Sequence, residues 1–329
     1  MVEEASCTVS FASLTKEELE NISIQTIINL LHLKQKRNAN NFHKDFRLDI
    51  HFHDFLTLTI SLPCDIHISI SDRPLEVVEQ SEGVKECVQL NDEQIQVVRF
   101  APQKFKLLDS GRDGFQALTT YFKNTFSIPV VDISGVLEAS ASPNYLMQFV
   151  VQWMKKTNWT IGTVNMICDE MLSTGSVDHF FNCIQGTVAT NLAGMCHINF
   201  STLRLVTPNL RIHNARWVTF QDLLAFDCSK LYLQNTTFTC FDVSQYLNHW
   251  CSWDQFKKHE NVVIVVNHPA SLEDVVAGSA RMIEVEKVVT DEKEQYVLRR
   301  PKDGSSAKLS SSIEVEKVYF NIEFIDEST

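Results

Sequence analysis

Two histidines on one expected strand are the strongest candidates in this chain for binding a metal ion. His51 and His53 lie two positions apart in the stretch RLDIHFHD, and side chains two apart on a strand point to the same face. Such a pair can present two imidazoles to a metal ion, with Asp54 or His67 as further ligands. Half-exposed strand positions also accept histidine without any ligand, and we favour this interpretation. We therefore expect no metal and no cofactor.

Motifs that mark common catalytic and nucleotide-binding sites are missing from the chain. It has no Gly-x-Ser-x-Gly, Gly-x-x-x-x-Gly-Lys-Ser/Thr, Gly-x-Gly-x-x-Gly or His-Glu-x-x-His, and only ten glycines with which to build a phosphate-binding loop. Pairs such as Asp178 with His179, or His249 with Cys251, are neighbours that do not face one another on a helix. The sequence predicts a protein that is not an enzyme.

Composition indicates a folded chain that works inside the cell. A length of 329 residues with 44% apolar residues suggests about two domains with sizeable cores. The net charge of −12 argues against nucleic acid or a membrane as the partner. No run of eighteen apolar residues occurs, and the start MVEEASCTVSF lacks the order of a signal peptide. We expect a cytoplasmic or nuclear location.

The cysteines do not form a recognisable ligand or disulfide pattern. They are odd in number, scattered and without a Cys-x-x-Cys pair, which favours small buried hydrophobes over a metal site or a disulfide framework. The nine positions are 7, 64, 87, 168, 183, 196, 228, 240 and 251.

The region from Asn209 to Val266 has the clearest element pattern. Residues 210–212 and 231–233 alternate as half-buried strands do, and residues 262–266 form the continuous apolar run of a buried parallel strand. The pattern predicts strand, helix, strand, helix and strand in that order.

Both helices in this region have a readable start. Thr219 precedes Asp222 by three residues, and Thr239 precedes Asp242 likewise, which is the capping-box spacing with Asp in place of Glu. The two caps are twenty residues apart (239 − 219), a repeat length typical of leucine-rich-repeat-like solenoids. Apolar stripes follow each cap at helical spacing: Phe220, Leu223 and Leu224, then Val243, Tyr246, Leu247 and Trp250.

These residues together resemble a known domain. Trp217, Asp222-Leu223-Leu224, Leu231-Tyr232-Leu233, Asp242 and Leu247-x-x-Trp250 are similar to the F-box-associated domain, type two, of the nematode-expanded family of F-box proteins. The resemblance implies a protein-binding adaptor that presents an unknown protein substrate to a Skp-cullin-F-box ubiquitin ligase, within the ubiquitin-like conjugation pathway. The motif residues could equally be core packing in any leucine-rich-repeat-like α/β domain, so we interpret Leu231, Leu233 and most of the others as structural.

The N-terminal segment, residues 1–45, is open to two interpretations. Residues 14–33 are helical in pattern and precede a basic run at 34–37, which resembles the second half of an F-box without its Leu-Pro opening. As a truncated F-box it would contact the Skp adaptor, and the candidate contact residues are Leu14, Leu19, Ile22 and Ile24. As an amphipathic helix packed on the next sheet it would leave a stand-alone protein-interaction module with no ligase link.

The rest of the chain is expected to form two further regions. Residues 46–100 predict an antiparallel β meander, with an acidic loop or marginal helix at 73–93. Residues 101–329 alternate strands and helices, which predicts a curved, mostly parallel, leucine-rich-repeat-like sheet with outer helices. The overall class is thus α/β.

The C-terminal tail predicts hairpins. Asp303-Gly304 separates two strand-like runs, which is a hairpin-turn signal, and the six residues IEVEKV occur twice, at 283–288 and 313–318. We expect these hairpins to cap the open edge of the repeat sheet. Trp159, Trp217 and Trp253 lie near element boundaries and are candidates for a contact surface.

Overall fold

The chain forms two compact units, which are described separately. In this computed structural model the first unit comprises Met1–Gly135 with Ala141–Gly162, and the second comprises Val136–Ser140 with Thr163–Thr329. The residues that the structure describes are 15, 18, 22–37, 47–52, 56–62, 66–71, 83–90, 93–108, 111–126, 128, 130–137, 149–150, 152–154, 156–157, 160–168, 180, 188–194, 207–252, 259–267, 269–279, 283–289 and 294–325.

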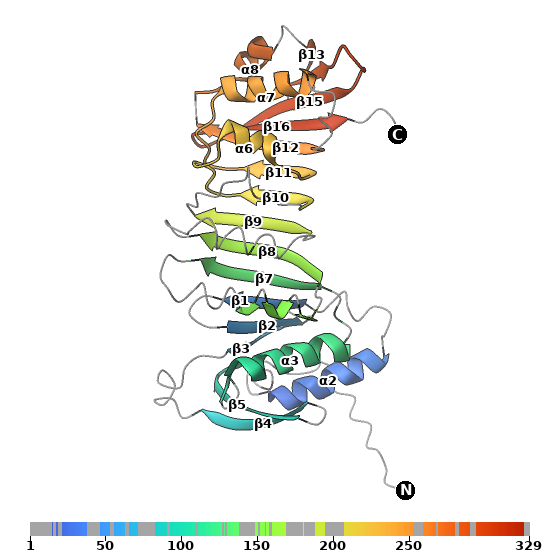
Figure 1. Ribbon diagram of the computed structural model, residues 1–329, viewed down its shortest axis with the longest axis vertical. Coiled ribbons are helices and arrows are strands. Elements are labelled where there is room, and N and C mark those ends of the chain that lie inside the picture. Colours follow the sequence, from blue (N-terminus) through green and yellow to red (C-terminus); the bar gives the residue numbers. More distant parts are fainter. Residues whose placement is uncertain are drawn as a thin grey trace. The chain divides into compact units, whose positions relative to one another are not determined.

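The first unit is built on a mixed sheet. Its strands, given in Figure 1, are β1 (Arg47–Phe52), β2 (Leu56–Leu62), β3 (Ile66–Ser71), β4 (Val84–Leu90), β5 (Glu93–Ala101), β6 (Lys104–Leu107) and β7 (Val130–Leu137). The spatial order is β7-β1-β2-β3-β6-β5-β4. The expected antiparallel meander is present, because β1 pairs with β2 and β2 with β3 in antiparallel register. Two parallel pairings, β1 with β7 and β3 with β6, were not expected.

Two helices supply the other half of the first core. Helix α3 (Gly111–Phe126) contacts β2 and β6, and Phe115, Leu118 and Phe122 on it are fully buried. Helix α2 (Ile24–Arg37) contacts α3 and β4. The sheet offers them one apolar face, since Leu48, Ile50 and Phe52 alternate with half-exposed positions along β1.

The structure differs from the sequence prediction in several places in this unit. The segment 73–93, expected as a loop or marginal helix, contains strand β4, whose Val88 and Leu90 are buried among exposed polar neighbours. Helix α2 continues through the basic run at 34–37 instead of ending before it. The expected boundaries at residues 45/46 and 100/101 both fall inside the first unit, because α2 packs on β4 and α3 packs on β2.

The second unit contains the region with the repeat pattern. Its strands are β8 (Thr160–Cys168), β9 (Ala189–Gly194), β10 (Asn209–Ile212), β11 (Lys230–Leu233), β12 (Asn261–Asn267), β13 (Glu284–Val289), β14 (Glu294–Arg299), β15 (Ser306–Glu314) and β16 (Lys317–Ile325). Strands β8 to β12 are parallel neighbours in chain order. The strands expected at 210–212, 231–233 and 262–266 are confirmed as β10, β11 and β12.

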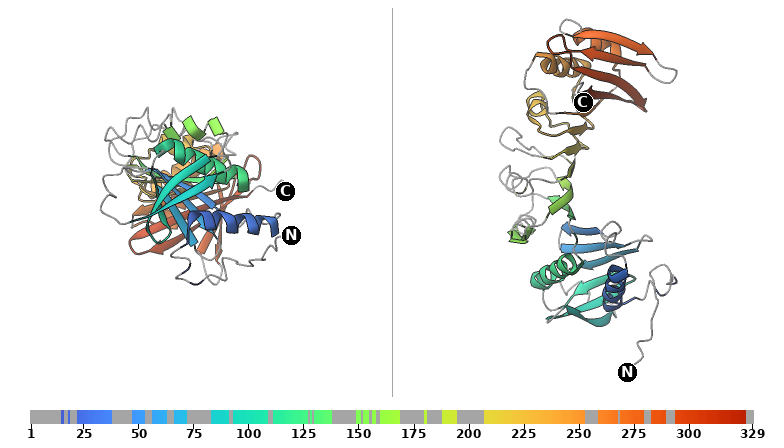
Figure 2. Two further views of the ribbon diagram at one scale, coloured as in Figure 1. Left: turned by 90° about the horizontal axis from the view of Figure 1, so that it is seen from below. Right: turned by 90° about the vertical axis from the view of Figure 1, so that its right-hand side faces the viewer.

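Helices cover one face of this parallel sheet. Figure 2, right, shows the helices of this region to one side of the strands. They are α6 (Phe220–Ala225), α7 (Cys240–Ser252) and α8 (Leu272–Ser279). Helices α7 and α8 approach closely at Ser244 and Gly278, where a Cβ on the glycine would lie 2.5 Å from the Ser244 hydroxyl oxygen.

The tail closes the edge of the parallel sheet, as expected. Strand β16 pairs antiparallel with β12, then β15 with β16 and β14 with β15, so hairpins extend the sheet beyond its last parallel strand. Asp303-Gly304 lies in the turn before β15, and Gly304 adopts φ +77°, where glycine carries no steric cost. The expectation of a mostly parallel sheet was wrong for the described strands, in which antiparallel pairings outnumber parallel ones. Among the described residues of the second unit, strands and helices alternate from β10 to α8, and hairpins follow.

Candidate protein-binding surface

Most of the family-motif residues lie in the core of the second unit. Leu223, Leu231, Leu233, Leu247 and Trp250 are at most 3% exposed, whereas Leu224 and Trp217 are half-buried. The Trp250 ring lies 5.4 Å from the Phe324 ring on β16, centroid to centroid. These side chains therefore hold α6 and α7 against the sheet and are not a contact surface.

The two motif aspartates fix the starts of the helices. The Thr219 hydroxyl accepts a hydrogen bond from the Asp222 backbone N–H (3.2 Å), and the Asp222 carboxylate accepts one from the Thr219 backbone N–H (2.9 Å). At the next helix the Asp242 carboxylate accepts bonds from the Thr239 backbone N–H and hydroxyl, each at 2.8 Å. The caps orient α6 and α7 over the same face of the sheet, which leaves the alternate side chains of the strands on the opposite face.

That opposite face is a candidate binding surface, and we call it the open face. It is defined by one row of half-buried or exposed side chains that runs across neighbouring strands: Asn165, Asn191, Arg211, Tyr232, Val263 and Asn321. The row alternates along each strand with the buried positions, such as Leu210 and Ile212 on either side of Arg211. The sequence contains a signal for this row, because Arg211 and Tyr232 are the central residues of two apolar triplets, and the central residue of such a triplet faces away from the core.

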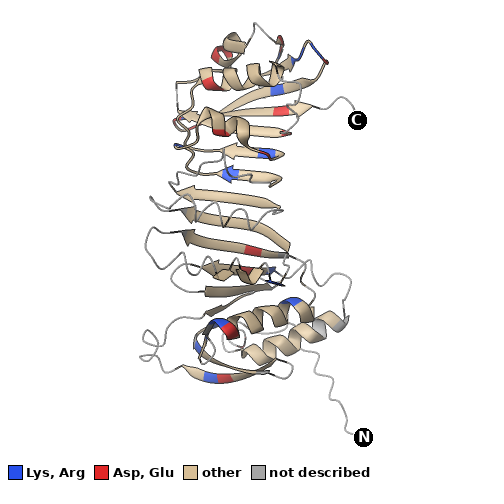
Figure 3. Ribbon diagram, in the orientation of Figure 1, with Lys and Arg blue, Asp and Glu red and all other residues tan. Residues whose placement is uncertain are grey.

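Contacts within the row give the open face its chemistry. The Arg211 guanidinium carbon lies 4.9 Å from the centre of the Tyr232 ring. The Asn191 amide donates to the Asn165 carbonyl oxygen (2.7 Å), and the Asn261 amide beside the row donates to the Asn321 carbonyl oxygen (2.8 Å). Strands β8, β9 and β12 contain no Lys, Arg, Asp or Glu, and Figure 3 shows this part of the sheet almost free of charge. Amides, one arginine and one tyrosine suit reversible contacts with another protein.

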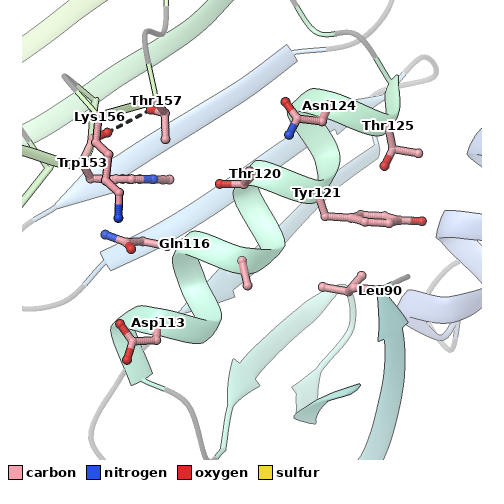
Figure 4. Close-up of a pocket in the computed structure, with 11 residues that line it drawn as sticks. Leu90, Asp113, Gln116, Thr120, Tyr121, Asn124, Thr125, Trp153, Lys156 and Thr157 are labelled. Carbon is pink, nitrogen blue, oxygen red and sulfur yellow. Dashed lines mark hydrogen bonds between the residues drawn. The ribbon is translucent and has the colours of Figure 1, made fainter. Parts of the chain in front are cut away.

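A recess lies in the first unit, beside α3. Its volume is about 580 Å³, and it is open to solvent. In Figure 4, Trp153 and Lys156 lie opposite Gln116, and Asp113 lies at the N-terminal end of the helix. The charged groups among its described lining residues are one carboxylate and one ammonium from opposite walls, and the rest are amides, hydroxyls and apolar groups. This lining could bind a peptide by hydrogen bonds, but it does not resemble a nucleophile activated by a base.

The candidate metal residues are only partly described. His51 is half-buried and shares its strand face with Asp49, whereas His67 is exposed and its Nδ1 lies 3.0 Å from the Ser61 hydroxyl. Burial lowers the pKa of His51. His53 and Asp54 lie outside the described residues. Among the residues that are described, no group of three or more His, Cys, Asp or Glu side chains is placed to hold a metal ion.

The described cysteines agree only in part with the expected burial. Cys228 and Cys251 are buried and Cys240 is half-buried, but Cys87 on strand β4 is exposed, so the interpretation as a buried hydrophobe was wrong for this residue. Cys87 lies on β4, in the segment that the sequence predicts as a loop or marginal helix, so its exposed position on a strand was not predicted. Burial raises the pKa of the Cys240 and Cys251 thiols, which keeps both in the unreactive protonated form at neutral pH.

Two of the candidate Skp contacts are described, Ile24 at the start of α2 and Ile22 just before it. Ile22 and Ile24 are 7% and 1% exposed, and Ile27, Ile28 and Leu31 continue the buried stripe at helical spacing. The Glu86 carboxylate on β4 accepts a hydrogen bond from the Ile24 backbone N–H (3.1 Å), at the first turn of α2. Leu14 and Leu19 lie outside the described residues. In this structure the two described isoleucines are therefore occupied by internal packing.

Of the three tryptophans that are candidates for a contact surface, the structure describes one. Trp217 lies in the loop that follows β10 and is half-buried, while Trp159 and Trp253 lie outside the described residues. Within the part of the chain that the structure describes, no helix is long and apolar enough to cross a membrane.

Comparison with known proteins bears on the second unit. A search of curated proteins finds no match to this chain. A family model described as F-box associated matches residues 194–254, a span that runs from the end of β9 through α7 and contains both helix caps and the family-motif residues. The resemblance predicted from the sequence is therefore confirmed for this span: residues 194–254 are similar to the F-box-associated family, type two.

Proposed function

We propose that the protein is an adaptor that binds another protein through its second unit and carries out no chemistry of its own. The open face supports this most directly. It is a continuous row of exposed and half-buried side chains on an F-box-associated domain, and its amide, arginine and tyrosine groups suit protein recognition. Parallel strands β8 to β12, with helices on the other face, would then work as a leucine-rich-repeat-like surface does.

In the first form of this proposal the adaptor serves a Skp-cullin-F-box ubiquitin ligase, in the cytoplasm or nucleus. The bound protein would be held near a ubiquitin-loaded partner, so that the adaptor acts by raising an effective concentration. The F-box-associated match supports this role, because the domain takes its name from its association with the F-box.

In the second form the protein is a stand-alone interaction module. The observation that favours it is the packing of α2, whose Ile24, Ile27 and Leu31 are buried in the first unit and whose N-terminus is bonded to Glu86. A Skp adaptor would have to displace these contacts or bind other residues of the chain.

Two measurements test the proposal. Titration of the purified chain with purified Skp adaptor, followed by calorimetry, decides between the two forms: binding at micromolar concentration supports the ligase role, and none contradicts it. Proximity labelling in cells then compares the wild type with Arg211→Glu, which reverses the charge at the centre of the open face.

Arg299→Glu is the matched control for the second measurement. Arg299 is also an exposed arginine on a strand of the same unit, but it lies on β14 and pairs with Glu286 at 3.4 Å. We expect partner proteins to lose labelling with Arg211→Glu and keep it with Arg299→Glu. If both variants label the same proteins as the wild type, the open face is not the binding surface.

A further inference from the structure

The tip of the β15–β16 hairpin exposes two branched apolar side chains. Ile313 is 63% exposed and Val315 is 98% exposed, although both belong to residue types that are usually buried. Lys317, at the base of the tip, donates a hydrogen bond to the Asn235 side-chain oxygen (2.5 Å) in the segment that follows β11. This bond ties the hairpin tip to the F-box-associated domain. We call residues 313–316 the hairpin tip.

Backbone geometry makes the hairpin tip more unusual. Glu314 pairs with Lys317, so Val315 and Glu316 form a two-residue turn, and Val315 has φ +57°. Glycine normally occupies the first turn position when its φ is positive, and a β-branched residue there is strained by ~1–3 kcal/mol. Within the described structure Val315 is 98% exposed, so burial of its side chain does not offset this strain.

Charge and shape around the tip indicate what it could contact. Glu314 and Glu316 are exposed on either side of Val315. A recess of about 520 Å³ lies between the tip and the end of β12, and Asn267, Ile313, Val315, Glu316 and Lys317 line it. The recess therefore combines an apolar surface with the Glu316 carboxylate and with the Lys317 ammonium, which is bonded to Asn235, while the exposed Glu314 lies beside it. The two exposed carboxylates are complementary to an aliphatic side chain flanked by basic ones.

We propose that the hairpin tip docks a short protein segment in which aliphatic residues alternate with lysine or arginine. This inference rests on the proposed protein-binding function and adds the chemistry of one partner segment. The aliphatic side chain enters the recess beside Ile313 and Val315, and the basic side chains on either side of it pair with Glu314 and Glu316. Exposed apolar residues next to complementary charges are a common way to bind short segments.

The chain itself contains a matched control for this site. Residues 283–288 repeat the sequence IEVEKV of residues 313–318, but they form the start of strand β13, and Ile283 is buried at 5% exposure. Glu284 and Glu286 are exposed there. Replacing both glutamates with lysine therefore changes the net charge identically at either copy, within identical flanking residues, and only one copy forms the hairpin tip.

The test uses the full chain and a fluorescein-labelled peptide of about twelve residues in which lysine alternates with valine. A second peptide replaces every lysine with glutamate. Fluorescence anisotropy is measured at about 0.15 M salt, where long-range attraction to the acidic chain is largely screened. We expect the lysine peptide to bind and the glutamate peptide not to bind.

The variants decide where it binds. Glu314→Lys with Glu316→Lys should weaken binding by about tenfold, and Glu284→Lys with Glu286→Lys by less than about twofold. Val315→Gly should weaken binding about fivefold without lowering the melting temperature, because glycine relieves the strained φ. Equal loss from both charge reversals, equal binding of the two peptides, or no binding of the lysine peptide would overturn the inference. The protein-binding function would survive any of these results if Arg211→Glu still removes partner labelling.

Discussion

The two units differ in whether the contacts that hold a helix against the sheet are local or join distant residues. In the second unit α6 and α7 each begin a few residues after a strand, at a Thr–Asp cap, and cover the strand beside it. In the first unit α2 is fixed to β4 by the bond from the Ile24 backbone N–H to Glu86, which is 62 positions away along the chain. Neighbouring residues thus specify one arrangement, while distant residues specify the other.

This difference explains why the sequence was informative in one unit and ambiguous in the other. A cap and an apolar stripe lie within about twenty residues and can be recognised together. The partner of a helix that packs on a distant strand has no such mark, so residues 14–33 could be interpreted as an F-box remnant or as a core helix. The structure favours the core helix for the described residues 22–37. Substitutions and deletions in each unit should show whether the local caps or the contacts between distant residues contribute more to stability.

The largest effect is expected from removing residues 1–37. Loss of α2 removes the packing of Ile24, Ile27, Ile28 and Leu31 and uncovers the apolar surface beneath them. Burial of four aliphatic side chains stabilises a fold by about 6–12 kcal/mol. This matches the whole stability of an ordinary domain, so the first unit should aggregate or melt early. Thermal melts of the truncated chain, with Asn29→Ala on the exposed side of α2 as the control, measure this. An unchanged melting curve would show that α2 is a separate module, as an F-box remnant would be.

A smaller but still large effect is expected from Leu223→Asp in α6. Leu223 is fully buried, so the change removes packing and buries a charge, which should cost at least about 4 kcal/mol. The adjacent Leu224 is half-buried, and Leu224→Asp should cost about 1 kcal/mol. Denaturant unfolding of the two variants compares them directly. If both variants lost the same free energy of unfolding, the assignment of Leu223 as the inward-facing residue of the two would be contradicted.

Loss of a single cap should have a moderate effect. Thr219→Ala removes the hydroxyl that accepts from the Asp222 backbone N–H, and a lost N-cap costs about 1 kcal/mol. Thr219→Ser keeps the hydroxyl and should stay close to the wild type. Chemical denaturation measures both. If the alanine variant is as stable as the serine variant, the local caps contribute little and packing alone holds the helices of the second unit.

The smallest effect is expected from Asp49→Asn on the exposed side of β1. Burial and the nearby Asp132 carboxylate raise the pKa of Asp49 above its usual 3.8. The folded chain therefore holds this proton more tightly than the unfolded chain, and stability falls as pH rises from the usual pKa through the raised one. Asparagine does not ionise, so the variant avoids this loss of stability and should melt at a higher temperature than the wild type at about pH 7. The difference in melting temperature should become smaller towards about pH 4. A variant that melts lower at neutral pH would contradict the assignment.

Residues of the candidate surface were harder to predict than the elements that carry it. The strands and caps between Asn209 and Val266 were predicted correctly, since period and capping are local properties. The pairing of Arg211 with Tyr232 depends on the register of β10 against β11, and register is set by the whole parallel sheet. Strand β4 was missed because its acidic neighbours concealed an alternation that begins only at Glu86.

The two copies of IEVEKV show which properties are local and which depend on the rest of the fold. Alternation of branched apolar and charged residues favours extended, paired structure, which residues 284–288 form in the first copy and residues 313–314 and 317–318 form in the second, on either side of the turn at Val315 and Glu316. It did not determine which side chains would be buried: Ile283 is 5% exposed and Ile313 is 63% exposed. The first copy leads into edge strand β13, whereas the second turns back on itself between β15 and β16. Burial depends on which strand and which helix lie opposite, and those contacts come from elsewhere in the chain.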